Sequence, residues 1–167
     1  MVFTLITMQD NKEYSSFQKL TFTTYKMMEA FMKSHVLLMM RHFEPSLIVK
    51  MIECTLLGLM TDNENKGSCC NALRDFCTTL YIDRNNLESK ISELVSFESS
   101  IFREILKTLL TTVIYEEHKV IWVFQKPLFP TIVINGMEDY EVVKNSILEN
   151  EPNADLRQKI QEELNQL

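Results

Sequence analysis

Hydrophobic residues recur every three or four positions along most of this chain, which is the spacing of residues on one face of an α-helix. The stretch from Phe17 to Tyr81 contains three such segments, separated by two short breaks. The stripe of the first segment comprises Phe17, Leu20, Thr24, Met27, Phe31, His35 and Leu38. We expect this segment to be a helix that buries this face.

Two further helices are predicted after the breaks. Pro45 suits the first turn of a helix but cannot continue the one before it, so a new helix should begin there. Its stripe comprises Ile48, Met51, Ile52, Thr55, Leu56 and Leu59. After the polar run 61–68, a third stripe comprises Cys69, Leu73, Phe76, Cys77 and Leu80. Because the connectors are short, residues 13–82 should form an antiparallel three-helix stack.

The downstream half repeats this pattern. Residues 83–118 should form helices that are interrupted near 97–100, and the second of them should run to about His118. Gly136 should end the preceding helical segment. The pattern over residues 136–167 then predicts two acidic helices. Pro152 and Asn153 open the last one, whose inward positions are Leu156, Ile160, Leu164 and Leu167.

Residues 119–135 allow two interpretations. The runs 120–124 and 131–134 are rich in β-branched residues and flank Lys126 and Pro127, as in a β-hairpin. A lone hairpin is only marginally stable, however, and neither run alternates with polar residues. We therefore predict two short helices bent at Pro127 and Pro130.

The whole pattern predicts an all-α fold. It fits a single HEAT-like helical-repeat region (an α-solenoid of paired antiparallel helices) over residues 1–167, with an irregular bundle as the alternative. Residues 1–12 should be the end of an upstream helix followed by a loop, since the apolar stretch Met1–Met8 has no partner within its own segment. Only three glycines and four prolines occur, which suits long helices.

Charge and composition narrow the classes of function. The net charge is −6, and residues 137–167 hold eight acidic residues against three basic ones. No cluster of Lys and Arg with interleaved aromatic residues occurs, so we expect no nucleic-acid groove. The apolar start lacks a basic region and no apolar run reaches membrane-spanning length. We therefore expect an intracellular chain with reduced thiols and no membrane insertion.

Residues with reactive side chains are present, but their spacing does not predict a site. No C-x2-C pair or matching His pair accompanies Cys54, Cys69, Cys70 and Cys77, so buried structural thiols are expected rather than a zinc site. A cysteine nucleophile would need a base from His35, His42 or His118, and His35 is better explained as a core or groove residue on its apolar stripe. We predict no catalytic residue, no metal, no cofactor and no enzymatic activity.

Two other groups of residues are candidates for a binding or catalytic site. Trp122, near Lys119 and Lys126, could anchor a partner, but a single tryptophan among Val and Ile is more often a core residue. The acidic pairs have no spacing that would fix two carboxylates across a cleft, and solvated helix ends explain them. They are Glu116-Glu117, Glu138-Asp139 and Glu162-Glu163.

Several segments, taken in order, resemble the C-terminal region of the exportin-7 family of nuclear transport receptors, also called Ran-binding proteins 16 and 17. The resemblance rests on scattered identities from about Phe3 to Leu167, and exportin-4-type receptors are similar here. In the first half, the segments are Phe17–Leu20, Thr24–Glu29, Phe43-Glu44-Pro45, Leu57-Gly58-Leu59, Gly67–Cys70, Leu73 and Thr79–Tyr81. In the second half, they are Leu106–Leu110, Tyr115–Glu117, Trp122, Lys126–Leu128 and Asn145–Ile147.

The resemblance implies a stack of HEAT-type helical hairpins, including helical structure over residues 120–135. It also implies a receptor that binds Ran in its GTP form together with protein cargo, passes nuclear pore proteins and shuttles between cytoplasm and nucleus. Receptors of that family are several times longer than this chain. Two other hypotheses remain from the residues themselves: a free-standing helical adaptor or assembly protein with no transport role, and a thiol-dependent enzyme.

Overall fold

The computed structural model describes residues 18–61, 64–115 and 121–165, and within these ranges the chain is all-α, with eight helices and no strand. The predicted fold class is therefore confirmed at this level. The helices are α3 (Gln18–His42), α4 (Pro45–Thr61), α5 (Lys66–Ile82), α6 (Arg84–Phe97), α7 (Ile101–Tyr115), α8 (Ile121–Asn135), α9 (Met137–Asn150) and α10 (Ala154–Leu164). The predicted segment 1–12 lies outside the described residues.

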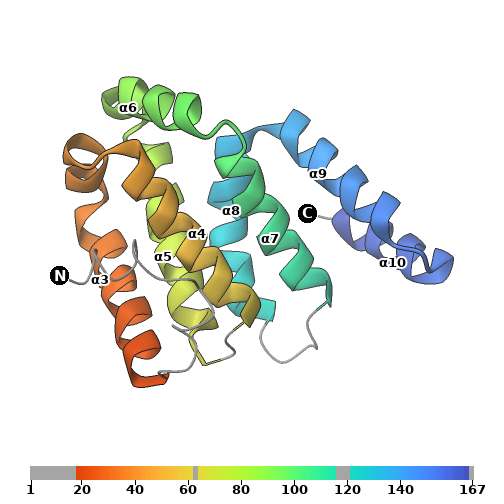
Figure 1. Ribbon diagram of the computed structural model, residues 1–167. Coiled ribbons are helices and arrows are strands. Elements are labelled where there is room, and N and C mark those ends of the chain that lie inside the picture. Colours follow the sequence, from red (N-terminus) through yellow and green to blue (C-terminus); the bar gives the residue numbers. More distant parts are fainter. Residues whose placement is uncertain (1–17, 62–63, 116–120, 166–167) are drawn as a thin grey trace.

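Most of the helices lie in two layers (Figure 1). In one layer, α5 packs against α3 on one side and against α8 on the other. In the second layer, α7 packs against α4 and α9. Contacts between α4 and α5 and between α7 and α8 join the layers, and α6 crosses one end of α3, α4 and α5. The last helix, α10, packs against α9.

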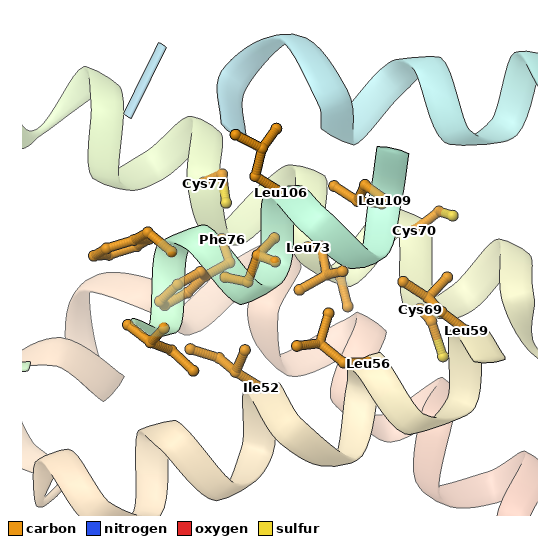
Figure 2. Close-up of a cluster of buried hydrophobic side chains, with 14 of the residues drawn as sticks. Ile52, Leu56, Leu59, Cys69, Cys70, Leu73, Phe76, Cys77, Leu106 and Leu109 are labelled. Atoms are coloured by element: carbon orange, nitrogen blue, oxygen red, sulfur yellow. The ribbon is translucent and has the colours of Figure 1, made fainter. Parts of the chain in front are cut away.

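The core lies where α4, α5 and α7 meet (Figure 2). Every residue of the predicted stripe of α4 is buried, and so is every residue of the predicted stripe of α5. Phe76 of α5 is the largest fully buried side chain, and Figure 2 shows it near Ile52 of α4 and Leu73 of its own helix. The second and third helices of the predicted stack are thus confirmed, together with the faces that they bury.

The first helix of the stack is confirmed, but the predicted face was wrong. Leu20 and Leu38 are 38% and 52% exposed, and Met27 and Phe31 are only half-buried. Phe17 lies outside the described residues, and of the remaining stripe only Thr24 is buried. The face that packs inward comprises Thr21, Thr24, Tyr25, Met28, Met32, Val36, Met39 and Met40. Both stripes have helical spacing, and packing against α5 selects the second.

His35 also differs from its prediction as a core or groove residue. Its side chain is exposed, and its ring centroid lies 5.4 Å from that of Phe31 on the preceding turn. Its backbone leaves helical geometry, with φ −132° and ψ 17°, so α3 is kinked at this residue. The kink lies between two buried residues, Met32 and Val36, and the inward face continues across it.

Residues 121–135 form one helix, α8, which continues through both prolines. The choice of helix over hairpin is confirmed, whereas the prediction of two short helices was wrong. A proline in a helix interior removes a hydrogen bond and costs about 3 kcal/mol. Here α8 is packed between α5 and α7, with Pro127 and Pro130 buried, and this burial offsets that cost. The hydroxyl of Thr131 also donates to the carbonyl of Pro127 at 2.7 Å.

The remaining boundaries follow the sequence closely. α6 ends at Phe97 and α7 begins at Ile101, so the predicted interruption is present, while the predicted extension to His118 lies outside the described residues. Gly136, with φ of 82°, separates α8 from α9. In α10, Ile160 and Leu164 are buried, but Leu156 is 37% exposed and Leu167 lies outside the described residues. Among the described helices, none is long and apolar enough to cross a membrane.

Candidate functional site

A groove of about 250 Å³ opens where the ends of α5, α7 and α8 meet α6 and the start of α9. Its position follows from the way α6 crosses the end of the layers. Leu87 and Leu94 of α6 are fully buried, while Ile91 and Val95, further round the same helix, are half-buried and line the groove. The apolar part of the lining comprises Leu80, Ile91, Val95, Phe102, Val133 and Ile134.

Three charged residues line the same groove. Arg103 of α7 and Asp139 of α9 form an ion pair, with distances of 2.5 Å from Nη2 and 3.1 Å from Nε to Oδ1. Arg84, the first residue of α6, is exposed and makes no hydrogen bond or ion pair with any residue that the structure describes. The lining therefore carries one net positive charge in a chain whose net charge is −6.

Asn135, the last residue of α8, adds a polar atom to the lining. Its Nδ2 donates to the carbonyls of Phe102 at 3.0 Å and Thr131 at 2.9 Å, which ties the end of α8 to α7. Its Oδ1 is buried and accepts no hydrogen bond from any described residue.

The groove is small and offers few reactive side chains among the described residues. Small-molecule sites usually occupy about 300–1,000 Å³, so this groove is small for a cofactor. The described part of its lining holds no Cys, His or Lys, and its one carboxylate is paired with Arg103. Within ranges 18–61, 64–115 and 121–165, no group of three or more His, Cys, Asp or Glu could hold a metal ion.

The cysteines lie away from this groove. On α5, Cys69, Cys70 and Cys77 are buried, whereas Cys54 on α4 is half-buried. Figure 2 shows the three buried cysteines in the core. Burial raises the pKa of the thiols of Cys70 and Cys77 to about 12, and it also raises the pKa of Cys54. Thiol catalysis needs a thiolate as nucleophile, and therefore a lowered pKa. The pKa values of Cys70 and Cys77 are raised instead.

Neither histidine that the structure describes is buried with these thiols. His35 and His42 are exposed, whereas Cys70 and Cys77 are buried, and His118 lies outside the described residues. Sγ of Cys77 instead lies within hydrogen-bonding distance, 3.5 Å, of Oγ1 of Thr131 on α8. The expected burial is therefore confirmed for the three cysteines of α5, and Cys54 is less buried than expected.

The other candidate residues are the tryptophan with its lysine neighbours and the acidic pairs. Lys119 and the pair Glu116-Glu117 lie outside the described residues, as does the side chain of Trp122. Glu162 and Glu163 are exposed, and Glu162 accepts from Gln158. Asp139 is more than a solvated helix end, because it pairs with Arg103 at the groove.

Sequence reasoning missed the groove. Its residues come from five helices, and its ion pair joins positions 36 apart, so no local spacing marks them. Arg84 belongs to the polar run 83–86, whose spacing predicts no site. Comparison of the chain with protein families, with curated proteins and with solved structures finds no match in any of the three.

Proposed function

We propose that this chain is a helical-repeat segment that binds protein partners, and that it works as the C-terminal part of an exportin-like nuclear transport receptor. The transport role comes from the resemblance to the exportin-7 family. The observation that supports a repeat architecture is the two-layer packing, in which α3, α5 and α8 lie side by side opposite α4, α7 and α9. The pairs α4–α5 and α7–α8 are then the helical hairpins.

One helix departs from a strict repeat. α6 belongs to neither layer and crosses the end of the stack between the two hairpins. In this proposal it is an insertion that covers the ends of α3, α4 and α5. Leu87 and Leu94, both fully buried, hold it there.

A stacked architecture suits a transport receptor for a physical reason. Each hairpin contacts only its neighbours, so small rotations between hairpins add up to a change in curvature. A partner that prefers one curvature shifts the population of conformers, and this couples the binding of one partner to that of another. In the full receptor these partners would be Ran in its GTP form and protein cargo, and passage through nuclear pores would carry the chain between nucleus and cytoplasm.

A free-standing adaptor is the second candidate. The observation that favours it is the groove at α6, which is complete within the described part of the chain and needs no further repeats. Both candidates are protein-binding roles without covalent chemistry. The raised pKa of the Cys70 and Cys77 thiols supports this choice over a thiol-dependent enzyme.

Capture from cell extract with the purified chain, in the presence of GTP-loaded or GDP-loaded Ran, separates the candidates. The transport proposal predicts recovery of Ran or cargo that depends on GTP. Recovery of a partner that is indifferent to the nucleotide would replace it with the adaptor. Recovery of neither Ran nor any other protein would overturn both.

A further inference from the structure

We propose that the groove formed by α5, α6, α7, α8 and α9 binds a short acidic segment of a protein partner, which inserts one large apolar side chain beside a carboxylate. This inference deepens the proposed protein-binding function, on which it rests, by naming the chemistry of the partner. Three features of the groove carry it: its size, its net charge and the fixed position of its α8 wall.

The size of the groove sets the number of side chains that enter it. At about 250 Å³ it lies below the usual range of about 300–1,000 Å³ for small-molecule sites, and it has room for a single large side chain such as Phe or Leu. Phe102, Leu80 and Val133 supply apolar surface from three different helices. A side chain inserted among them would contact residues of all three helices.

The charges at the groove select an acidic segment. Asp139 and Arg103 pair through two hydrogen bonds, so their charges offset each other and do not select the charge of the partner. Arg84 has no partner among the described residues, and its exposed guanidinium can bind a carboxylate through two parallel hydrogen bonds. A carboxylate next to the inserted apolar side chain would complete this pair.

Asn135 fixes one wall of the groove. Its Nδ2 donates to the carbonyls of Phe102 and Thr131, which ties the end of α8 to α7. The groove therefore presents a preformed wall to the inserted side chain.

Fluorescence anisotropy with the full chain and a labelled peptide, Ser-Glu-Asp-Phe-Asp-Glu-Ser, tests the proposal. We expect saturable binding that weakens as salt is added, because part of the attraction is between exposed charges. Replacing Phe by Ala in the peptide should weaken binding about tenfold or more, since burial of a Phe side chain is lost. A peptide with Lys in place of every Asp and Glu should bind at least about tenfold more weakly.

Two variants with the same change of charge provide the matched pair. Arg84→Glu should weaken binding of the acidic peptide at least about tenfold and should improve binding of the lysine peptide. Arg41→Glu alters an exposed arginine at the end of α3, away from the groove, and should leave both affinities unchanged. Because both arginines are exposed, each variant should retain the helical circular dichroism of the parent.

Several outcomes would overturn the inference. They are equal binding of the acidic and lysine peptides, equal weakening by both variants, and the absence of saturable binding by the acidic peptide. Dimerisation that Arg84→Glu abolishes would also overturn it, since a second copy of the chain would then occupy the groove. The assay contains no Ran or extract, so peptide binding without GTP-dependent capture refutes only the transport role, and capture without peptide binding refutes only the groove.

Discussion

Gly58 of α4 lies directly against the ring of Tyr25 of α3. A Cβ atom at position 58 would lie 2.5 Å from Cζ of Tyr25 and 2.7 Å from Sγ of Cys69 on α5. Both distances are well below van der Waals contact, so only glycine permits this approach. Gly58 thus sets the spacing at which α3, α4 and α5 pack together.

Gly58→Ala should lower the free energy of unfolding by about 1–3 kcal/mol, because the added methyl group overpacks a contact between three helices. Urea unfolding followed by circular dichroism measures the change. Gly67→Ala in α5 is the matched control, since a Cβ there meets nothing within 4 Å. It should be neutral or stabilising by up to about 1 kcal/mol through helix propensity. Equal effects of the two substitutions would refute the role of Gly58.

Phe76→Ala should be among the most damaging single substitutions. The ring is fully buried between α4, α5 and α7, so its removal leaves a cavity and costs about 3–5 kcal/mol. Phe129→Ala makes the same chemical change at a side chain that is 72% exposed, and its effect should stay within about 0.5 kcal/mol. The urea midpoints of the two variants test this difference. Similar midpoints would show that the α5 core is not the centre of stability.

Glu151 should make stability depend on pH in the acid range. Its carboxylate accepts from the backbone N–H of Asn153 at 3.0 Å and from the hydroxyl of Tyr115 at 2.8 Å. These bonds, with the nearby charge of Arg157, lower the pKa of Glu151 below its ordinary value of 4.5. Because the pKa is lower in the folded state, this stabilisation is present above pH 4.5 and is lost as pH falls through the folded-state pKa.

Glu151→Gln should therefore be less stable than the parent chain at pH 7, and the gap should narrow at pH 3. Thermal unfolding at both pH values measures it. Glu149→Gln, two residues earlier and exposed, is the control and should show no such narrowing. A gap of constant size at the two pH values would contradict the assignment to the Glu151 carboxylate.

Asn153→Ala should loosen α10. The Asn153 side chain accepts from the backbone N–H groups of Asp155 at 3.0 Å and Leu156 at 3.2 Å, which caps the helix. Loss of such a cap costs about 0.5–2 kcal/mol. Hydrogen exchange should quicken in α10 but not in α5, whereas Asn145→Ala on the exposed surface of α9 should change neither. Faster exchange throughout the chain would argue against a local cap.

Much of the fold could be predicted where local chemistry and burial agree. α4 begins at Pro45, and each apolar residue on its predicted stripe is buried, because that helix offers only one apolar face. The stripe of α5 behaves in the same way. Asn153 was recognised at the start of α10 because side-chain capping depends on residues only two and three positions away.

The sequence alone determined that this chain is helical, where most of its helices begin and end, and which face α4 and α5 bury. Those features depend on spacings of a few residues, which the chain order contains directly. Tertiary structure decided the rest. α3 carries two competing apolar stripes, and packing against α5 decides which of them is buried. α8 continues through two prolines, and packing against α5 holds it in one helix. The groove with Arg84 and Asn135 arises only when five helices meet, because its net charge depends on which side chains become neighbours.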